Sequence, residues 1–321
     1  MSESPSTAAA NKEKSSAALT SVIAAVALTV FKIIVGAMTG SLGILAEAAH
    51  SGLDLVAALV TFIAVRFSGR PADVKHHYGH GKIENLSALF ETLLLLATSA
   101  WIIYEAIQRL FVSKVEVEVS IWAFAVMAIS IIIDFSRSRV LYRAARKYNS
   151  QALEADALHF STDIWSSSVV IVGLIGVTIS KYVPSLKWMH QADAVAAIGV
   201  AIIVVFVSVQ LGKRTIEVLL DTVPDGVNDK IKALISEMPG VQNVHNLRMR
   251  NAGPEHFIDA HILIDPKLDL VAVHQLTEDI EVAIRQILPG ADVTIHAEPV
   301  EKDEKIVKPR SSKKTKTKPA A

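Results

Sequence analysis

Six long apolar segments, separated by short polar stretches, limit this chain to a membrane fold. Each segment supplies the roughly 20 residues that cross about 30 Å of hydrocarbon as a helix. Lipid offers the backbone no hydrogen-bond partners, so segments of this kind must be helical. We expect six transmembrane helices, near residues 17–38, 42–66, 84–111, 118–140, 155–180 and 192–212.

The residues after the sixth segment are typical of a small soluble fold. Prolines punctuate short segments there, and helical stretches near 226–238 and 270–288 alternate with strand-like runs at 243–250, 256–264 and 291–298. The order helix, strand, strand, helix, strand predicts a small α+β domain. The predicted fold class is therefore a polytopic α-helical membrane domain followed by this α+β domain.

Composition divides the chain into four parts. The first residues are rich in Ser, Ala and Lys and the last are basic, so both ends are expected to be disordered. The expected parts are a disordered cytosolic tail at 1–15, the six-helix transmembrane domain at 16–212, a cytosolic α+β domain at 213–300 and a disordered basic tail at 301–321.

The distribution of Lys and Arg predicts the orientation in the bilayer. Basic residues gather around the second and fourth connections between helices and after the sixth helix, whereas the first connection has none. Cytosolic loops carry an excess of Lys and Arg. Both termini are therefore expected to lie in the cytosol.

Two features of the composition exclude classes of function. The formal net charge is zero, so nothing overall indicates a nucleic-acid partner. The chain has no cysteine, which excludes disulfides, thiolate metal sites and cysteine nucleophiles. Any metal must therefore be held by nitrogen and oxygen ligands, and no motif indicates an organic cofactor.

The pattern H-x-x-x-D occurs in two of the apolar segments. The residues are His50 and Asp54 in the second segment and His159 and Asp163 in the fifth. Residues four apart share one helix face, so two such helices packed together bring four ligands to one point. Two imidazoles and two carboxylates make a tetrahedral set that suits zinc.

Placing these ionisable residues inside a membrane has a cost. A central Asp is penalised by roughly 2.5 to 3.5 kcal/mol. A divalent ion or protons would compensate for this penalty. An internally paired polar patch without metal is the alternative, but the repetition of the pair on two separate helices favours metal ligands.

The paired motif resembles the cation diffusion facilitator family of zinc and related metal exporters. The loop after the second segment strengthens the resemblance with its spacing Asp73-x-x-His76-x-x-x-His80-Gly81-Lys82. The resemblance covers residues 16–300 and implies an exporter rather than an enzyme, working as a homodimer in a lipid bilayer. Members that handle cadmium as well as zinc carry Asp where this chain has His50, so zinc is expected ahead of cadmium, iron, cobalt and manganese.

The resemblance implies two further metal sites outside the membrane. One lies in the loop and is formed by Asp73, His76 and His80. The other is a two-metal cluster at a dimer contact, which gives the α+β domain a metal-sensing and dimerisation role. Its candidate ligands are His245, His261, His274, His296 and Glu298.

Two details qualify these cytosolic sites. His296 and Glu298 are two apart on a strand and so face the same side, but Glu298 stands where family members carry Asp. The alternative for both sites is that their histidines are ordinary surface residues that bind no metal. By analogy with the family, Lys82 and Asp221 are expected to form an interlocking ion pair at the membrane boundary.

A site of neutral imidazoles and ionised carboxylates must release protons when it binds metal and regain them when it releases metal. Imidazole suits this exchange because its ordinary pKa is about 6.5. We therefore expect metal to be exchanged for protons by alternating access. The expected location is a bacterial-type inner membrane.

Two alternatives come from other classes of protein. An intramembrane metalloenzyme would keep an open position on its metal, whereas four ligands fill the coordination sphere. A membrane-anchored metal sensor would not need buried ionisable residues in its anchor. Among transporters, one whose main cargo is iron, cadmium or manganese is the alternative to a zinc exporter.

Overall fold

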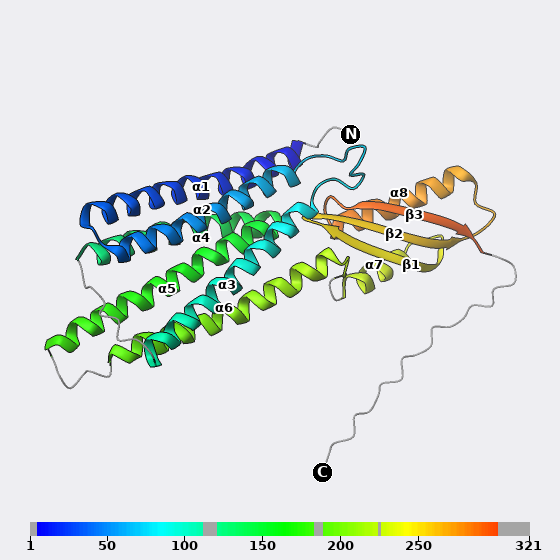
Figure 1. The fold of residues 1–321 in the computed structure, drawn as a ribbon. Helices are drawn as coiled ribbons and strands as arrows, with labels where there is room; N and C mark the ends of the chain where they lie inside the picture. Colours follow the sequence, from blue (N-terminus) through cyan, green and yellow to red (C-terminus); the bar gives the residue numbers. More distant parts are fainter. Residues whose placement is uncertain (1–4, 112–120, 183–188, 224–225, 301–321) are drawn as a thin grey trace, which may run out of the picture. The chain divides into compact units, whose positions relative to one another are not determined.

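The computed structural model describes the chain except for residues 1–4, 112–120, 183–188, 224–225 and 301–321 (Figure 1). The basic tail expected at 301–321 therefore lies outside the described residues. The chain forms two compact units. The helical unit comprises residues 1–223 and 250–256, and the α+β unit comprises residues 224–249 and 257–321.

Six long helices form the helical unit, in the expected order (Figure 1). They are α1 (Pro5–Thr39), α2 (Leu42–Ser68), α3 (Lys82–Phe111), α4 (Ile121–Tyr148), α5 (Gln151–Tyr182) and α6 (Met189–Leu219). Within the described residues, all but α5 are long and apolar enough to cross a membrane. The first half of α5 contains three acidic residues, Glu154, Asp156 and Asp163.

Helix α1 begins at Pro5, inside the segment expected to be a disordered tail. This segment is rich in Ala and Lys, which are good helix formers. It also has partners elsewhere in the unit: Lys14 Nζ lies 2.7 Å from Glu84 Oε1, and Glu13 Oε2 lies 2.6 Å from Lys147 Nζ. These contacts are distant in sequence, so composition alone did not indicate them.

Small residues on α5 allow it to pack closely against its neighbours. Ala152, Ala155 and Ala157 are fully buried. Ala152 and Ala157 belong to a core shared with α1, α2 and α4, while Ala155 packs with residues of α3 and α6. Small side chains let helix backbones approach one another in a membrane, and α5 therefore contacts helices on both sides.

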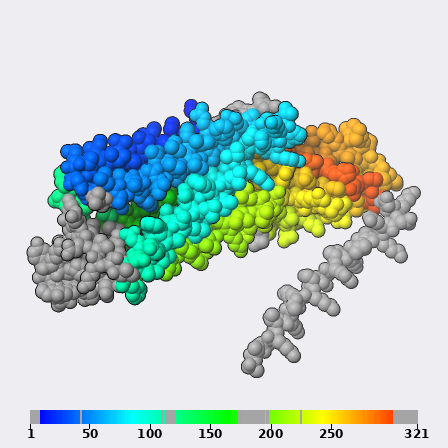
Figure 2. Space-filling model, in the orientation of Figure 1, coloured from blue at the N-terminus to red at the C-terminus, as the bar shows by residue number. Residues whose placement is uncertain are grey.

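The outward faces of the helices carry large apolar side chains. Residues more than half exposed occur on all six helices, among them Ile23, Leu53, Trp101, Ile132, Trp165 and Phe206. In the space-filling view, side chains of α1, α2 and α3 lie side by side along one face (Figure 2). An apolar exterior of this kind suits lipid as the surrounding solvent.

The α+β unit has the expected element order of helix, strand, strand, helix, strand. Its elements are α7 (Val227–Ser236), β1 (Val241–Ala252), β2 (Glu255–Ile264), α8 (Leu270–Ile287) and β3 (Asp292–Pro299). The sheet order is β1-β2-β3, and β2 pairs parallel to β3. Parallel strands need a crossover connection, and α8 is that connection.

One face of this sheet forms the core of the α+β unit. Ile258, Ala260 and Ile262 alternate along β2 and are buried, together with Ile280 and Ile284 of α8. His261 lies between two of these core residues and so points to the opposite face. The parallel register pairs His261 with His296, which places two imidazoles side by side on that opposite face.

Candidate metal centres

Four residues of α2 and α5 meet inside the helical unit and form what we call the intramembrane cluster: His50, Asp54, His159 and Asp163. Ligand atoms of Asp54, His159 and Asp163 all lie within 4.8 Å of one another. His159 Nε2 lies 3.1 Å from Asp54 Oδ1 and 3.7 Å from Asp163 Oδ2. Nitrogen and oxygen atoms at these separations are close enough to bind one divalent ion.

His50 forms the more open side of the intramembrane cluster. Its Nε2 lies 3.8 Å from Asp54 Oδ1 and 3.9 Å from Asp163 Oδ1. The side chain of His50 is 41% exposed, whereas that of His159 is 4% exposed. The four residues expected from the sequence therefore lie together, with His159 buried and His50 partly exposed.

Local helix geometry explains this meeting. Each His precedes its Asp by four residues, so both point from the same face of their helix. Below the cluster, α2 and α5 share a core that includes Ala58 and Val65 of α2 and Ala157 and Phe160 of α5. Packing through these residues fixes the spacing of the two helices and hence the spacing of the ligands.

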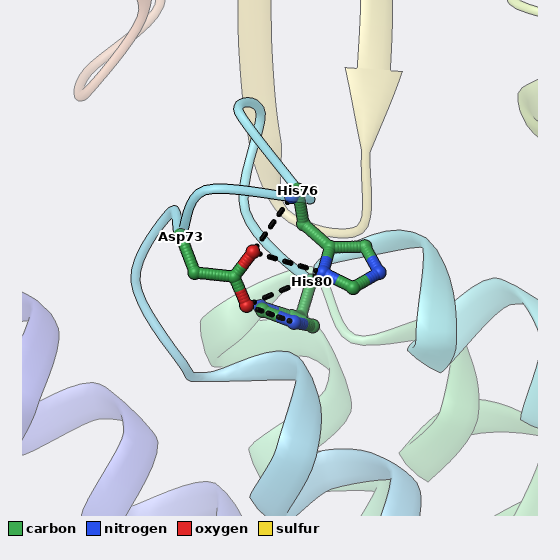
Figure 3. Close-up of side chains that lie close together, drawn as sticks. All are labelled: Asp73, His76 and His80. Carbon is green, nitrogen blue, oxygen red and sulfur yellow. Dashed lines mark hydrogen bonds and ion pairs between the residues drawn. The ribbon is translucent and has the colours of Figure 1, made fainter.

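The loop after α2 holds a second group, the loop cluster, formed by Asp73, His76 and His80 (Figure 3). His76 Nδ1 lies 3.1 Å from Asp73 Oδ1, and His80 Nε2 lies 3.4 Å from Asp73 Oδ2. Gly79, with φ of 72°, supplies the left-handed turn that brings His80 back toward Asp73. His77 points elsewhere, with its Nε2 3.0 Å from the carbonyl of Val74.

The carboxylate of Asp73 is fixed in its charged form. It accepts hydrogen bonds from the backbone N–H groups of His76, at 2.7 Å, and Lys75, at 2.8 Å. These bonds hold the pKa of Asp73 below its ordinary value. An ionised oxygen ligand is therefore present beside two imidazoles at the surface of the helical unit.

A third group, the sheet cluster, lies on the open face of the α+β sheet around Glu298. His261 Nδ1 lies 2.8 Å from Glu298 Oε1, and His245 Nε2 lies 3.2 Å from Glu298 Oε2. His296 Nε2 lies 3.5 Å from Glu298 Oε1. The hydrogen bond with His261 lowers the pKa of Glu298, so the longer acidic side chain stands charged at the centre of three imidazoles.

His274 does not join the sheet cluster within one chain. It lies on α8, where its Nε2 is 3.4 Å from Glu278 Oε1, and its side chain is 70% exposed. The two residues are one helical turn apart, which accounts for their contact. The structure thus brings together four of the five ligands expected in this unit.

Lys82 and Asp221 lie next to each other in the helical unit. Lys82 Nζ is 2.7 Å from Asp221 Oδ1, and both side chains are partly exposed. Asp221 follows the end of α6 with φ of 59°, a conformation that is uncommon for a residue other than glycine. This turn directs the carboxylate toward the first residue of α3.

The sequence reasoning missed several buried charged residues, and Glu91 and Lys32 are two of them. Glu91 on α3 is fully buried, and its Oε2 lies 3.9 Å from His159 Nδ1. Lys32 on α1 is also buried, and its Nζ lies 2.8 Å from Ser51 Oγ and 3.2 Å from Glu47 Oε2. Lys32 is the lone charge of the apolar segment 17–38, and Glu91 is the one charge between Glu84 and Glu105. Charges are rare at such positions, and that rarity was the available signal.

Six long helices, five of them apolar enough to cross a membrane within the described residues, and a cluster of nitrogen and oxygen ligands among them define a membrane transporter of cations. Two family models match the chain: a cation efflux transmembrane domain over residues 18–220 and a cation efflux protein cytoplasmic domain over residues 223–300. The chain belongs to the cation efflux family, whose members are transporters and not enzymes. The resemblance to cation diffusion facilitators is thereby confirmed.

Curated relatives support the same conclusion along most of the chain. The cation-efflux pumps FieF of Salmonella arizonae and Salmonella typhimurium are each 33% identical over 292 residues, which is 89% of this chain and 92% of the relative. A solved structure of CzrB, described as a candidate zinc transporter, is 31% identical. It covers 25% of this chain and 99% of its own, with a TM-score of 0.24.

Proposed function

We propose that this protein exports a divalent metal, with zinc as its main cargo, through the intramembrane cluster. The observation that carries the proposal is the meeting of His50, Asp54, His159 and Asp163 from helices α2 and α5 of the helical unit. Two imidazoles and two carboxylates match the ligand number and type that zinc prefers. Family membership makes the transport of a cation the natural use of such a site.

Exchange for protons is the second part of the proposal. Metal binds the cluster only when both imidazoles are neutral and both carboxylates are ionised, so binding expels protons and protonation expels metal. Because His50 is partly exposed while His159 is buried, protons and metal would enter and leave on the His50 side in this conformation. Alternating access would then open the cluster to the other side.

The proposal also covers the orientation in the membrane, the cellular membrane and the oligomeric state. The Lys and Arg distribution supports cytosolic termini, and the bacterial pumps among the relatives support a bacterial inner membrane. A match to the dimer-forming domain model over residues 223–300 supports a homodimer. In such a dimer the loop and sheet clusters would act as regulatory metal sites, and Lys82 with Asp221 as the interlocking pair.

Flux measurements in proteoliposomes test the central claim. The purified full chain, reconstituted with a pH gradient, should carry zinc faster than cadmium, iron or manganese, and dissipating the gradient should abolish zinc accumulation. A different metal carried fastest would replace zinc as the main cargo. Metal binding without any flux would favour a metal sensor and contradict the proposal.

The identity of residue 50 should control selectivity. In His50→Asp, a carboxylate that can bind through two oxygens replaces a single nitrogen, which suits the larger cadmium ion. The ratio of cadmium flux to zinc flux should rise by at least about threefold. His50→Asn is the matched control, because it has similar size to Asp but no charge. An unchanged ratio in His50→Asp would refute the selectivity role of His50.

Glu298 should contribute most to metal binding at the sheet cluster, because it contacts all three imidazoles. In a full chain whose other two clusters are disabled by Asp54→Ala and Asp73→Ala, Glu298→Gln should weaken zinc binding by about tenfold or more, since the amide brings no charge. Chelator competition measures the affinity. Glu278→Gln is the control, because Glu278 pairs only with the separate His274; equal losses in the two variants would contradict the assignment.

A further inference from the structure

Two buried polar atoms face each other behind the intramembrane cluster. Glu91 Oε2 and His159 Nδ1 lie 3.9 Å apart, and neither has a hydrogen-bond partner among the residues that the structure describes. Buried polar atoms are rarely left unpaired, because each lost hydrogen bond carries a desolvation penalty. Two orphans at this distance point to a bond that forms in another state of the molecule.

The structure holds Glu91 in place for such a bond. Its Oε1 accepts a hydrogen bond from Thr61 Oγ1 on α2 at 3.0 Å, and Thr61 also lies 3.4 Å from Ser87 Oγ. Glu91, Thr61 and Ser87 are all buried. One oxygen of the carboxylate is thus tied to α2, and the other is left facing the imidazole on α5.

The chemistry of imidazole gives this arrangement a use. The Nε2 atom of His159 faces Asp54 and Asp163, so it is the nitrogen that would meet the metal. A neutral imidazole offers a metal only the nitrogen that carries no proton. His159 must therefore carry its proton on Nδ1, and an acceptor beside Nδ1 favours that tautomer. Histidine ligands in metal sites are commonly oriented in this way by a carboxylate.

We propose that Glu91 is a positioning residue of the transport site, which accepts the Nδ1 proton of His159 in a hydrogen bond and so presents Nε2 to the metal. The inference rests on the proposed function, in which His159 is a ligand. The observed separation exceeds a hydrogen bond, whose limit is about 3.2 Å, so the bond belongs to the metal-loaded state. Forming the bond would require a small rotation of one of the two side chains.

A purely structural role is the competing explanation. Glu91 would then only join α3 to α2 through Thr61, and its second oxygen would be incidental. The two explanations differ in what they predict for metal binding. A structural residue affects stability, while a positioning residue affects the apparent affinity of the site and the tautomer of His159.

Zinc flux in proteoliposomes separates these explanations. Glu91→Gln keeps the shape and the contact with Thr61, but its amide can donate to Nδ1 and favour the wrong tautomer. Its KM for zinc should rise about 10- to 100-fold, as for other partners of metal ligands. Glu91→Asp, which keeps the charge on a shorter arm, should show a smaller rise. Ser87→Ala is the control, because it removes a contact of Thr61 and leaves Glu91 intact.

Nitrogen-15 magnetic resonance of histidine-labelled protein in bilayers provides a readout independent of flux. The His159 signal, identified by its absence in His159→Gln, should report a proton on Nδ1 in the unsubstituted protein and a shift toward Nε2 protonation in Glu91→Gln. An unchanged KM with an unchanged tautomer in Glu91→Gln would overturn the inference. Absence of flux in the unsubstituted protein would instead reject the proposed function, while the resonance data would still test the Glu91–His159 pair.

Discussion

Asp54→Ala is expected to abolish metal flux, with a loss of at least about 100-fold in proteoliposomes. Asp54 Oδ1 lies 3.1 Å from His159 Nε2 and 3.8 Å from His50 Nε2, so this one oxygen contacts both imidazoles of the cluster. Removing it takes away a charge and a ligand together. The remaining site would bind a divalent ion weakly. Only one carboxylate would be left in it to link metal binding to proton release.

The matched control for this change is Glu217→Gln. Glu217 is an acidic residue near the end of α6, and its side chain is 45% exposed and paired with the exposed Lys213. This variant should keep most of the flux. Zinc binding at the loop and sheet clusters should persist in Asp54→Ala, which shows that the chain is folded. Normal flux through Asp54→Ala would contradict the assignment of the transport site.

Lys14→Ala is expected to destabilise the helical unit by about 3 to 5 kcal/mol, as when one partner of a buried ion pair is removed. Lys14 Nζ lies 2.7 Å from Glu84 Oε1, and their side chains are 3% and 0% exposed. Ser68 also donates to Glu84, at 2.9 Å, and Ser150 contacts its other oxygen. These hydroxyls cannot neutralise the carboxylate, so the variant leaves a buried charge without its counter-ion.

An exposed pair between α1 and α4 provides the comparison. Glu13 and Lys147 form an ion pair in which both side chains are more than half exposed, and Lys147→Ala should cost only about 0 to 1 kcal/mol. Denaturant unfolding of the reconstituted protein, followed by helix content, measures both losses. Equal destabilisation in the two variants would show that burial of the Lys14–Glu84 pair has no energetic consequence.

The sequence was sufficient for much of the fold because local patterns determined it. The long apolar segments predicted the membrane helices, and the spacing of two along the last strand predicted that His296 and Glu298 face the same side. The H-x-x-x-D spacing placed each ligand pair on one helix face. These features depend only on helical and strand periodicity, which a single sequence displays.

Features that depend on distant residues were not predictable in this way. The helical start of α1 depends on partners such as Glu84 and Lys147, and these lie far along the chain. The contact of Glu91 with His159 depends on the packing of α3 against α5, which no local sequence pattern displays. His274, expected in the sheet cluster, stands on α8 with Glu278, because its placement depends on the docking of that helix.

The parallel pairing of β2 and β3 has a further consequence for the sheet cluster. His261 and His296 are neighbours only in this register, and a shift of one residue would turn His296 and Glu298 into the core and Val293 outward. The register in turn depends on α8, which returns the chain to the sheet edge. Metal binding at the sheet cluster therefore reports whether the α+β unit has folded. A chain in which α8 has not packed against the sheet would not bring these histidines and Glu298 together.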